Sequence, residues 1–250
     1  TGRALTKPMA HERERLHGAT FNGDESRILT WGEDGTARLW NAESGKPSRL
    51  PLAHDSIVYG ARFSADESRI LTWSADGTAR LWDAETGLPM MPPLTHGDSV
   101  VGARFNADES RILTWSDDGT LRLWEAGIDA YVDWVAPHIE RRSVGGTWFS
   151  GDGLRILTRD SRSTVRLWDT TAGKATTPSL SHEGMVSGAE LNHDGSRILT
   201  WGRDGNVRLW DGVYGLPITP PMEHDGVEGA QLYADVDLIL SWGRDGTARL

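Results

Sequence analysis

A histidine, a threonine and an aspartate that recur together are the residues of this chain most suggestive of chemistry. His54, Thr72 and Asp76 form one set, followed by Trp82. A histidine beside a hydroxyl and a carboxylate is the arrangement used in nucleophilic acyl transfer. Three further sets are His11, Thr30, Asp34 and Trp40; His96, Thr114, Asp118 and Trp124; and His182, Thr200, Asp204 and Trp210. Repeated copies favour a structural role, because stacked repeats reuse the same internal contacts whereas an active site occurs once.

The sets belong to a longer repeat that runs through the chain. The segment RILTWSADGTARLW at 69–82 returns with small changes, and its copies begin at residues 27, 69, 111, 155, 197 and 238. This period of 41 to 44 residues predicts one supersecondary unit stacked on copies of itself.

Each repeat has the pattern of short antiparallel strands. In the second repeat, apolar runs at 58–63, 69–74 and 78–82 are separated by polar turns. A three-residue loop at 75–77 pairs Thr72 with Arg80 and places Thr72 on the same face as Trp82. A two-residue Asp-Gly loop would put them on opposite faces, so we expect the longer loop. Paired acids such as Asp66 and Glu67 fall in the polar turns, where solvation is the simpler role than acid–base catalysis.

Proline placement indicates which strand is outermost. All eleven prolines lie in the last segment of a repeat, and a proline cannot donate to a sheet ladder. The fourth strand of each repeat is therefore predicted to be an exposed edge. Four-stranded antiparallel sheets with covered faces and one outward edge predict an all-β fold, a six-bladed β-propeller.

The repeat resembles the WD-repeat β-propeller family over essentially the whole chain. A histidine opens each repeat, Asp-Gly marks the turn, and Arg-Leu-Trp-Asp closes the third strand, although the Gly-His pair of the family is not kept. The resemblance implies that each set forms a hydrogen-bonded network: aspartate accepts from histidine, histidine binds the hydroxyl, and the hydroxyl accepts from the indole. The sequences of the repeats are similar to those of bacterial arrays of this family.

The repeats predict a single domain over residues 1–250. Their approximate bounds are 11–53, 54–95, 96–137, 138–181, 182–223, and 224–250 together with 1–10. The last repeat has three strands, and residues 2–10 resemble an outer strand. We therefore expect the N-terminal strand to complete the last blade and close a monomeric ring. A slice of a longer array is the alternative.

A glycine precedes the end of every inner strand, which suggests close approach of the backbones around an axis. The neighbouring positions are candidates to line a central channel: Thr20, Arg62, Arg104, Trp148, Glu190 and Gln231. A tryptophan in the second strand is expected to fill the core between blades. It occurs at positions 31, 73, 115, 201 and 242.

Composition excludes several classes of function. Aspartate and glutamate outnumber lysine and arginine by 36 to 26, which disfavours binding to nucleic acid. No apolar run reaches membrane-spanning length. The repeated histidines are too far apart for a metal motif, and no glycine loop would cradle a phosphate, so we expect neither metal nor cofactor. The chain has no cysteine, which is typical of a reducing compartment, and we expect a cytoplasmic protein.

The fourth repeat departs from the pattern. Arg159 replaces the tryptophan, and Ser161-Arg162-Ser163 replaces the Asp-Gly turn. Aromatic residues and arginines dominate interface hot spots, so this repeat is a candidate recognition surface. The candidate residues are Tyr131, Trp134, Arg141, Arg142, Trp148, Arg159 and Arg162. The alternative is simple drift, with Trp134 packed inward.

The resemblance implies a non-catalytic scaffold or sensor that binds a protein or peptide, within a larger bacterial signalling protein. Propellers present loops on a rigid support, and such loops carry binding. Two alternatives remain open. One is a purely structural or oligomerising domain, and the other is an enzyme with its site at the channel mouth, using Arg62, Arg104 and Glu190.

Overall fold

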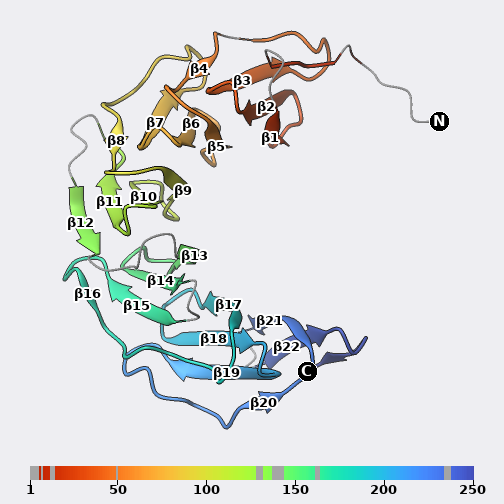
Figure 1. Cartoon of the computed structure of the whole chain (residues 1–250), viewed down its shortest axis with the longest axis vertical. Coiled ribbons are helices and arrows are strands. Elements are labelled where there is room, and N and C mark those ends of the chain that lie inside the picture. Colours follow the sequence, from red (N-terminus) through yellow and green to blue (C-terminus); the bar gives the residue numbers. More distant parts are fainter. Residues whose placement is uncertain are drawn as a thin grey trace. The chain divides into compact units, whose positions relative to one another are not determined.

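The described part of the chain consists of short strands joined by turns. The computed structural model describes residues 6, 8–11, 15–48, 50–127, 132–136, 144–160, 164–233 and 238–250, with 132–136, 144 and 145 described by their backbone alone. Within these ranges the strands form six antiparallel sheets (Figure 1). No helix in them is long and apolar enough to cross a membrane.

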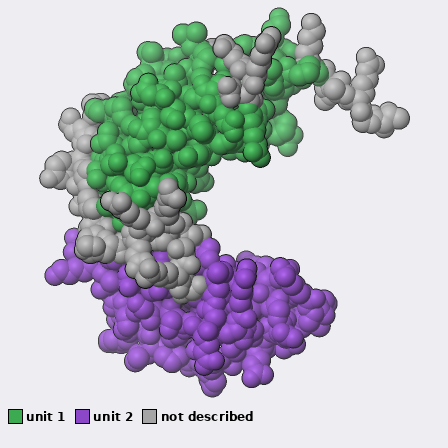
Figure 2. All heavy atoms as spheres, in the orientation of Figure 1, with its two compact units in different colours: residues 1–135 green, residues 136–250 purple. Residues whose placement is uncertain are grey.

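The chain divides into two compact units, residues 1–135 and 136–250, which Figure 2 distinguishes by colour. Unit 1 holds three sheets. The first contains β1 (Leu16–Phe21), β2 (Arg27–Gly32), β3 (Thr36–Asn41) and β4 (Leu52–Ala53). The second contains β5 (Val58–Phe63), β6 (Arg69–Ser74), β7 (Thr78–Asp83) and β8 (Leu94–Thr95). The third contains β9 (Val100–Phe105), β10 (Arg111–Ser116), β11 (Leu121–Glu125) and β12 (Val132–Ala136).

Unit 2 holds the other three sheets of the described chain. The fourth contains β13 (Val144–Phe149), β14 (Arg155–Asp160), β15 (Val165–Asp169) and β16 (Lys174–Ala175). The fifth contains β17 (Val186–Leu191), β18 (Arg197–Gly202), β19 (Asn206–Asp211) and β20 (Met222–Glu223). The sixth contains β21 (Val227–Tyr233), β22 (Leu238–Gly243) and β23 (Ala248–Arg249). The single closed domain expected from the repeats stays a prediction.

The hairpin register in the second sheet confirms the three-residue loop. Thr72 pairs with Arg80, and Trp73 pairs with Ala79, across β6 and β7. Gly77 has a φ of 80°, the left-handed conformation that this loop requires and that glycine adopts without a steric penalty. Since side chains alternate along a strand, this register places Thr72 and Trp82 on one face of the sheet.

Four of the outer strands are short, as their prolines predict, whereas β12 of the third sheet has five residues. β4, β8, β16 and β20 are two residues long and lie at the edges of their sheets. Isolated bridges join Trp40 to Pro47, Trp82 to Pro89 and Trp210 to Pro217. The missing N–H of each proline limits further pairing at that edge.

The apolar core lies between neighbouring sheets within each unit. In unit 1, Leu29 and Leu39 of the first sheet cluster with Ala61 and Ile70 of the second. In unit 2, Leu157 and Leu167 of the fourth sheet cluster with residues of the fifth such as Ala189. The second sheet has such a cluster on each of its two faces, which explains why its middle strands are apolar on both sides.

The inner-strand glycines have a different reason from the close backbone approach we expected. A Cβ on Gly60 would overlap the indole of Trp73, and a Cβ on Gly18 or Gly102 would overlap Trp31 or Trp115. Trp73 packs against the core between the second and third sheets, and Trp31 packs against the core between the first and second. The glycine therefore makes room for an indole.

Glutamates in the polar turns join neighbouring sheets of unit 1. The Glu67 carboxylate accepts from Asn22 Nδ2 at 2.7 Å and from Arg27 Nη2 at 3.0 Å. The Glu109 carboxylate accepts from the backbone N–H of Ala65 at 2.6 Å and from Arg69 Nη2 at 2.8 Å. We expected Glu67 to be a solvated turn residue. Its carboxylate also bonds to residues of the first sheet, so the expectation was incomplete.

The predicted closing strand, 2–10, lies largely outside the described residues. Of its positions the structure describes residue 6 and residues 8–10, and these are in no strand. The sixth sheet has three strands within the described chain. Closure by the N-terminal segment stays a prediction.

Candidate functional site

The histidine set of the second sheet forms a continuous hydrogen-bonded chain. His54 Nδ1 lies 2.9 Å from Asp76 Oδ2, and His54 Nε2 lies 2.7 Å from Thr72 Oγ1. Trp82 Nε1 donates to the same hydroxyl at 2.8 Å. Thr72 is fully buried and His54 is 8% exposed. We call such a set a tetrad.

Three other tetrads have the same connections. The His Nδ1 to Asp distances are 2.8 Å for His11 and Asp34, 3.3 Å for His96 and Asp118, and 2.9 Å for His182 and Asp204. The His Nε2 to Thr distances are 2.8 Å to Thr30, 2.7 Å to Thr114 and 2.8 Å to Thr200. Trp40, Trp124 and Trp210 each donate to their threonine at 2.8 Å. Each threonine hydroxyl therefore lies between an imidazole and an indole in the protein interior.

Two further residues in the tetrad surroundings were missed from the sequence. Thr78 Oγ1 donates to Asp76 Oδ1 at 2.7 Å, and Arg80 Nη2 lies 3.4 Å from Asp76 Oδ2. The first and third sheets repeat the threonine contact through Thr36 and Thr120. The sequence pattern Asp-Gly-Thr-x-Arg could have identified both residues, because the threonine and the arginine follow the aspartate at the same spacing in several repeats. The aspartate is thereby satisfied on several sides.

These contacts assign the protons of the tetrad. The Asp76 carboxylate can only accept, so its contact with His54 requires the proton on Nδ1. The Nε2 of the neutral ring is then unprotonated and accepts from the Thr72 hydroxyl, which in turn accepts from the indole N–H. Burial lowers the pKa of His54, against the opposing effect of Asp76, which favours this neutral form. The Thr72 hydroxyl is fully buried and bonds to both the imidazole and the indole, so no substrate can reach it, and the geometry is that of a structural network.

Stability is expected to fall as the pH drops below neutral. Burial lowers the pKa of His96 from 6.5 to about 4, so between these values the unfolded chain binds a proton that the folded chain does not. The same direction holds for His182. The free energy of unfolding should therefore be lower at about pH 5 than at about pH 7, as measured by denaturant titration.

A comparison of two variants identifies the source of this slope. His96→Gln should flatten the dependence of stability on pH, whereas Thr95→Val, at an exposed residue that does not titrate, should leave it intact. A stability that is constant or rises on acidification over this interval would contradict the neutral, buried imidazole.

The fourth and sixth sheets have altered sets. In the fourth, Trp168 Nε1 donates to Thr158 Oγ1 at 2.9 Å, while its histidine, His138, lies outside the described residues. In the sixth, His224 Nδ1 lies 2.7 Å from Ser241 Oγ and Nε2 lies 3.2 Å from Asp245 Oδ1. The two ring nitrogens have thus exchanged partners relative to the tetrads.

The channel candidates fall into two groups, one in each unit. In unit 1, Thr20 and Arg62 line a hollow with Trp31 and Trp73. Burial lowers the pKa of Arg104, and the neighbouring Arg62 guanidinium lowers it further. It stays a prediction that Arg62 and Arg104 share one channel with the candidate residues of unit 2.

In unit 2, Trp148, Glu190 and Gln231 line a second hollow with the indoles of Trp201 and Trp242. Burial raises the pKa of Glu190, although its carboxylate accepts the backbone N–H of Leu232 at 3.0 Å.

Several candidates of the fourth repeat lie outside the described residues: Tyr131, Arg141, Arg142 and Arg162. Trp134 lies in β12, the outermost strand of the third sheet, which is described by its backbone. Arg159 Nη1 donates to the backbone carbonyl of Val186 at 2.9 Å and is thereby joined to the fifth sheet. These observations leave the recognition role of the repeat as a prediction.

Trp148 has a packing role that explains one departure of the fourth repeat. Arg159 stands opposite Gly146, where the other sheets have a tryptophan. The Trp148 indole covers Gly146 instead, and it packs against the core cluster that contains Leu157. The tryptophan has therefore moved from the second strand to the first while filling a comparable space.

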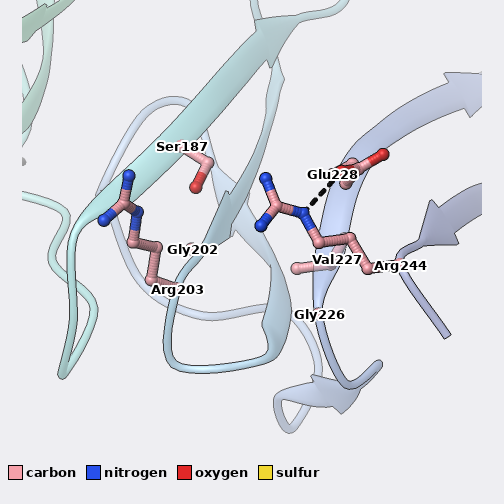
Figure 3. A pocket seen from close by; sticks show the side chains of 7 residues that line it. All are labelled: Ser187, Gly202, Arg203, Gly226, Val227, Glu228 and Arg244. Carbon is pink, nitrogen blue, oxygen red and sulfur yellow. Dashed lines mark hydrogen bonds and ion pairs between the residues drawn. The ribbon is translucent and has the colours of Figure 1, made fainter.

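A polar pocket between the fifth and sixth sheets was not anticipated from the sequence. Its volume is about 540 Å³, and its wall includes Ser187, Arg203, Glu228 and Arg244 (Figure 3). Arg244 Nε donates to Glu228 Oε1 at 2.7 Å. Among the described residues, no group of three or more histidines, cysteines, aspartates or glutamates is placed to hold a metal ion.

The sheets and tetrads define a class of all-β repeat protein, built of three- and four-stranded antiparallel sheets in a way consistent with a six-bladed propeller. Residues 45–83, 93–125 and 176–211 match the family model described as "WD domain, G-beta repeat". These three segments are WD repeats.

Comparison with known proteins supports the fold. The computationally designed Ika8 protein, known from a crystal structure, is similar with a TM-score of 0.69 and 19% sequence identity. The match covers 99% of this chain and 73% of the designed chain. At this identity the likeness concerns the fold alone. No curated protein matches the chain in sequence.

Proposed function

We propose that this chain is a non-catalytic protein-interaction scaffold or sensor within a larger bacterial signalling protein. WD-repeat domains are generally protein-interaction scaffolds and usually non-catalytic. The observation that carries the proposal is the enclosure of the tetrads. Their histidines and threonines, the residues most suited to catalysis, already bond to one another in the interior, as in His54 and Thr72.

The exposed turns, in contrast, vary along the chain. Turn residues differ from sheet to sheet, whereas the buried residues of the sheets recur. Arg203 and Arg244 stand where the first and third sheets have Glu33 and Asp117. Variation in exposed turns on a repeated scaffold is the pattern expected of a binding protein.

Affinity capture from a lysate of the source cells tests the proposal. The wild-type chain is compared with a variant carrying Trp134→Ala, Arg141→Ala and Arg142→Ala and having the same thermal stability. A protein captured by the wild type supports an interaction module, and its loss in the variant places the contact on the fourth repeat. Capture by both forms moves the contact to another surface. Turnover of a hydrolase substrate by the wild type would contradict a non-catalytic role.

A structural or oligomerising domain is the second candidate. It is favoured by the sixth sheet, in which β23 has no outer neighbour within the described chain. An edge strand of this kind can pair with another strand. Light scattering would distinguish an oligomerising domain from the proposed monomeric module. The measured mass rises with concentration if the chain oligomerises, and it stays constant if the chain is a monomer.

A further inference from the structure

Two surface positions of the repeat come together beside the turn that follows the second strand. One lies near the start of the inner strand and the other in the turn. In the first sheet they are His17 and Glu33, whose side chains are 3.4 Å apart. In the sixth sheet they are Glu228 and Arg244, at 2.7 Å. The backbone supports the equivalence, since Glu33 N–H donates to Arg15 O as Arg244 N–H donates to Gly226 O.

The fifth sheet has the basic member of this pair without the acidic one. Its two positions are Ser187 and Arg203, and the Arg203 N–H donates to Met185 O in the same way. Ser187 cannot supply a negative charge. Among the described residues, the Arg203 guanidinium makes no hydrogen bond or ion pair. The fifth sheet therefore presents an arginine at a place where a neighbouring sheet binds its arginine to a carboxylate.

The pocket between the fifth and sixth sheets collects these groups. Ser187, Arg203, Glu228 and Arg244 all belong to its wall, and its volume of about 540 Å³ leaves room for a ligand side chain. Figure 3 shows the Arg244 guanidinium extending toward Ser187 and Arg203, with Glu228 bound to its Nε. The Arg244 and Glu228 side chains are 82% and 50% exposed, and an ion pair in such solvent contact is weak enough for a competing acid to replace it.

The charge of the pocket differs from that of the rest of the chain. The formal net charge is −10, and the equivalent turn positions of unit 1 are Glu33, Ala75 and Asp117. The two guanidiniums outweigh the one carboxylate of the pocket wall. Arginine donors in a fixed fork suit planar or tetrahedral oxyanions, which they bind with two parallel hydrogen bonds.

We propose that this pocket binds an oxyanion side chain of a partner peptide, a carboxylate or a phosphate, through Arg203 and Arg244 with Ser187 as a further donor. The inference rests on the proposed interaction function and names the chemistry of one contact. The partner's anion takes the place beside Arg203 that Glu228 takes beside Arg244.

Fluorescence anisotropy with the whole chain tests this site. Three labelled peptides share one neutral host sequence and carry at their centre a glutamate pair, a phosphoserine or a glutamine pair. At least one anionic peptide should bind about tenfold or more tightly than the glutamine peptide, and its affinity should fall with added salt. Comparing the two anionic peptides shows whether the pocket prefers a carboxylate or a phosphate. Inorganic phosphate, added as a competitor, shows whether the anion binds without the rest of the peptide.

Three variants connect the binding to the pocket. Arg203→Gln should weaken the anionic peptide about tenfold. Ser187→Glu should do so as well, because the new carboxylate occupies Arg203 from within. Lys174→Gln removes the same charge from the exposed β16 and should leave binding unchanged. A thermal melt of each variant verifies that it is folded.

The proposal is overturned if neither anionic peptide binds up to about 1 mM, where a weak contact of this kind is still measurable. It is equally overturned if the glutamine peptide binds as well as they do, or if Arg203→Gln binds like the wild type. Each of these results leaves the capture experiment with the source lysate unaffected. Failure of the site and failure of the interaction function are thus separable.

Discussion

Replacing Thr72 by valine should lower the free energy of unfolding by about 2–6 kcal/mol. Valine has nearly the shape of threonine, so the core around it stays filled. The change removes the one hydroxyl that accepts from Trp82 Nε1 and lies within hydrogen-bond distance of His54 Nε2. Both groups are buried, and each unpaired buried polar group costs about 1–3 kcal/mol. Chemical denaturation followed by tryptophan fluorescence measures the loss.

Thr95→Val is the matched control for this substitution. Thr95 is exposed in β8, so the same change there removes a hydroxyl that water can replace. We expect a shift within about 0.5 kcal/mol, as for most surface substitutions. Equal stability of Thr72→Val and Thr95→Val would show that the tetrad contributes nothing to the fold.

Adding a single methyl group at Gly60 should lower the free energy of unfolding by about 2–3 kcal/mol. The new Cβ would overlap the Trp73 indole, which packs against the core between the second and third sheets. The indole must move away, and its contacts with the core are lost. Because alanine is otherwise more favourable than glycine within a strand, any destabilisation reports the overlap.

Two comparisons isolate this overlap. Gly127→Ala adds a methyl group that meets none of the described residues within 4 Å, and it should leave stability unchanged. In a Trp73→Leu background, Gly60→Ala should cost little, because the overlapping ring is gone. A cost that persists in that background would show that the glycine is needed for another reason.

The hairpin register and the edge strands could be predicted because local rules determine them. The loop at 75–77 requires a left-handed residue, and Gly77 supplies it at a fixed distance from Thr72 and Trp82. Proline excludes itself from inner strands by its missing N–H. The sequence of a single repeat contains the turn and proline positions, and it was therefore sufficient to predict the hairpin register and the edge strands.

Contacts between repeats were harder to predict, because they depend on side chains from segments that are distant in sequence. The bond from Glu67 to Asn22 joins residues 45 positions apart. The overlap that makes Gly60 necessary lies within one repeat, but it too appears only once β5 and β6 are paired, since Trp73 lies opposite it. The pocket of Ser187 and Arg203 likewise requires the fifth and sixth sheets to be adjacent. Aligning the repeats by position, rather than by motif, would have revealed the unmatched arginine.

The most direct test of the account concerns the protonation of the tetrad histidines, since the central claim is that they belong to a structural network. Imidazole nitrogen chemical shifts of the folded chain can be followed by NMR from about pH 8 to about pH 5. The account predicts that His54, His96 and His182 keep a protonated Nδ1 and an unprotonated Nε2 at neutral pH and titrate below the usual value of 6.5. Imidazoles that titrate at or above 6.5 would contradict it, because these histidines would then be open to solvent and to a ligand, as catalytic groups must be.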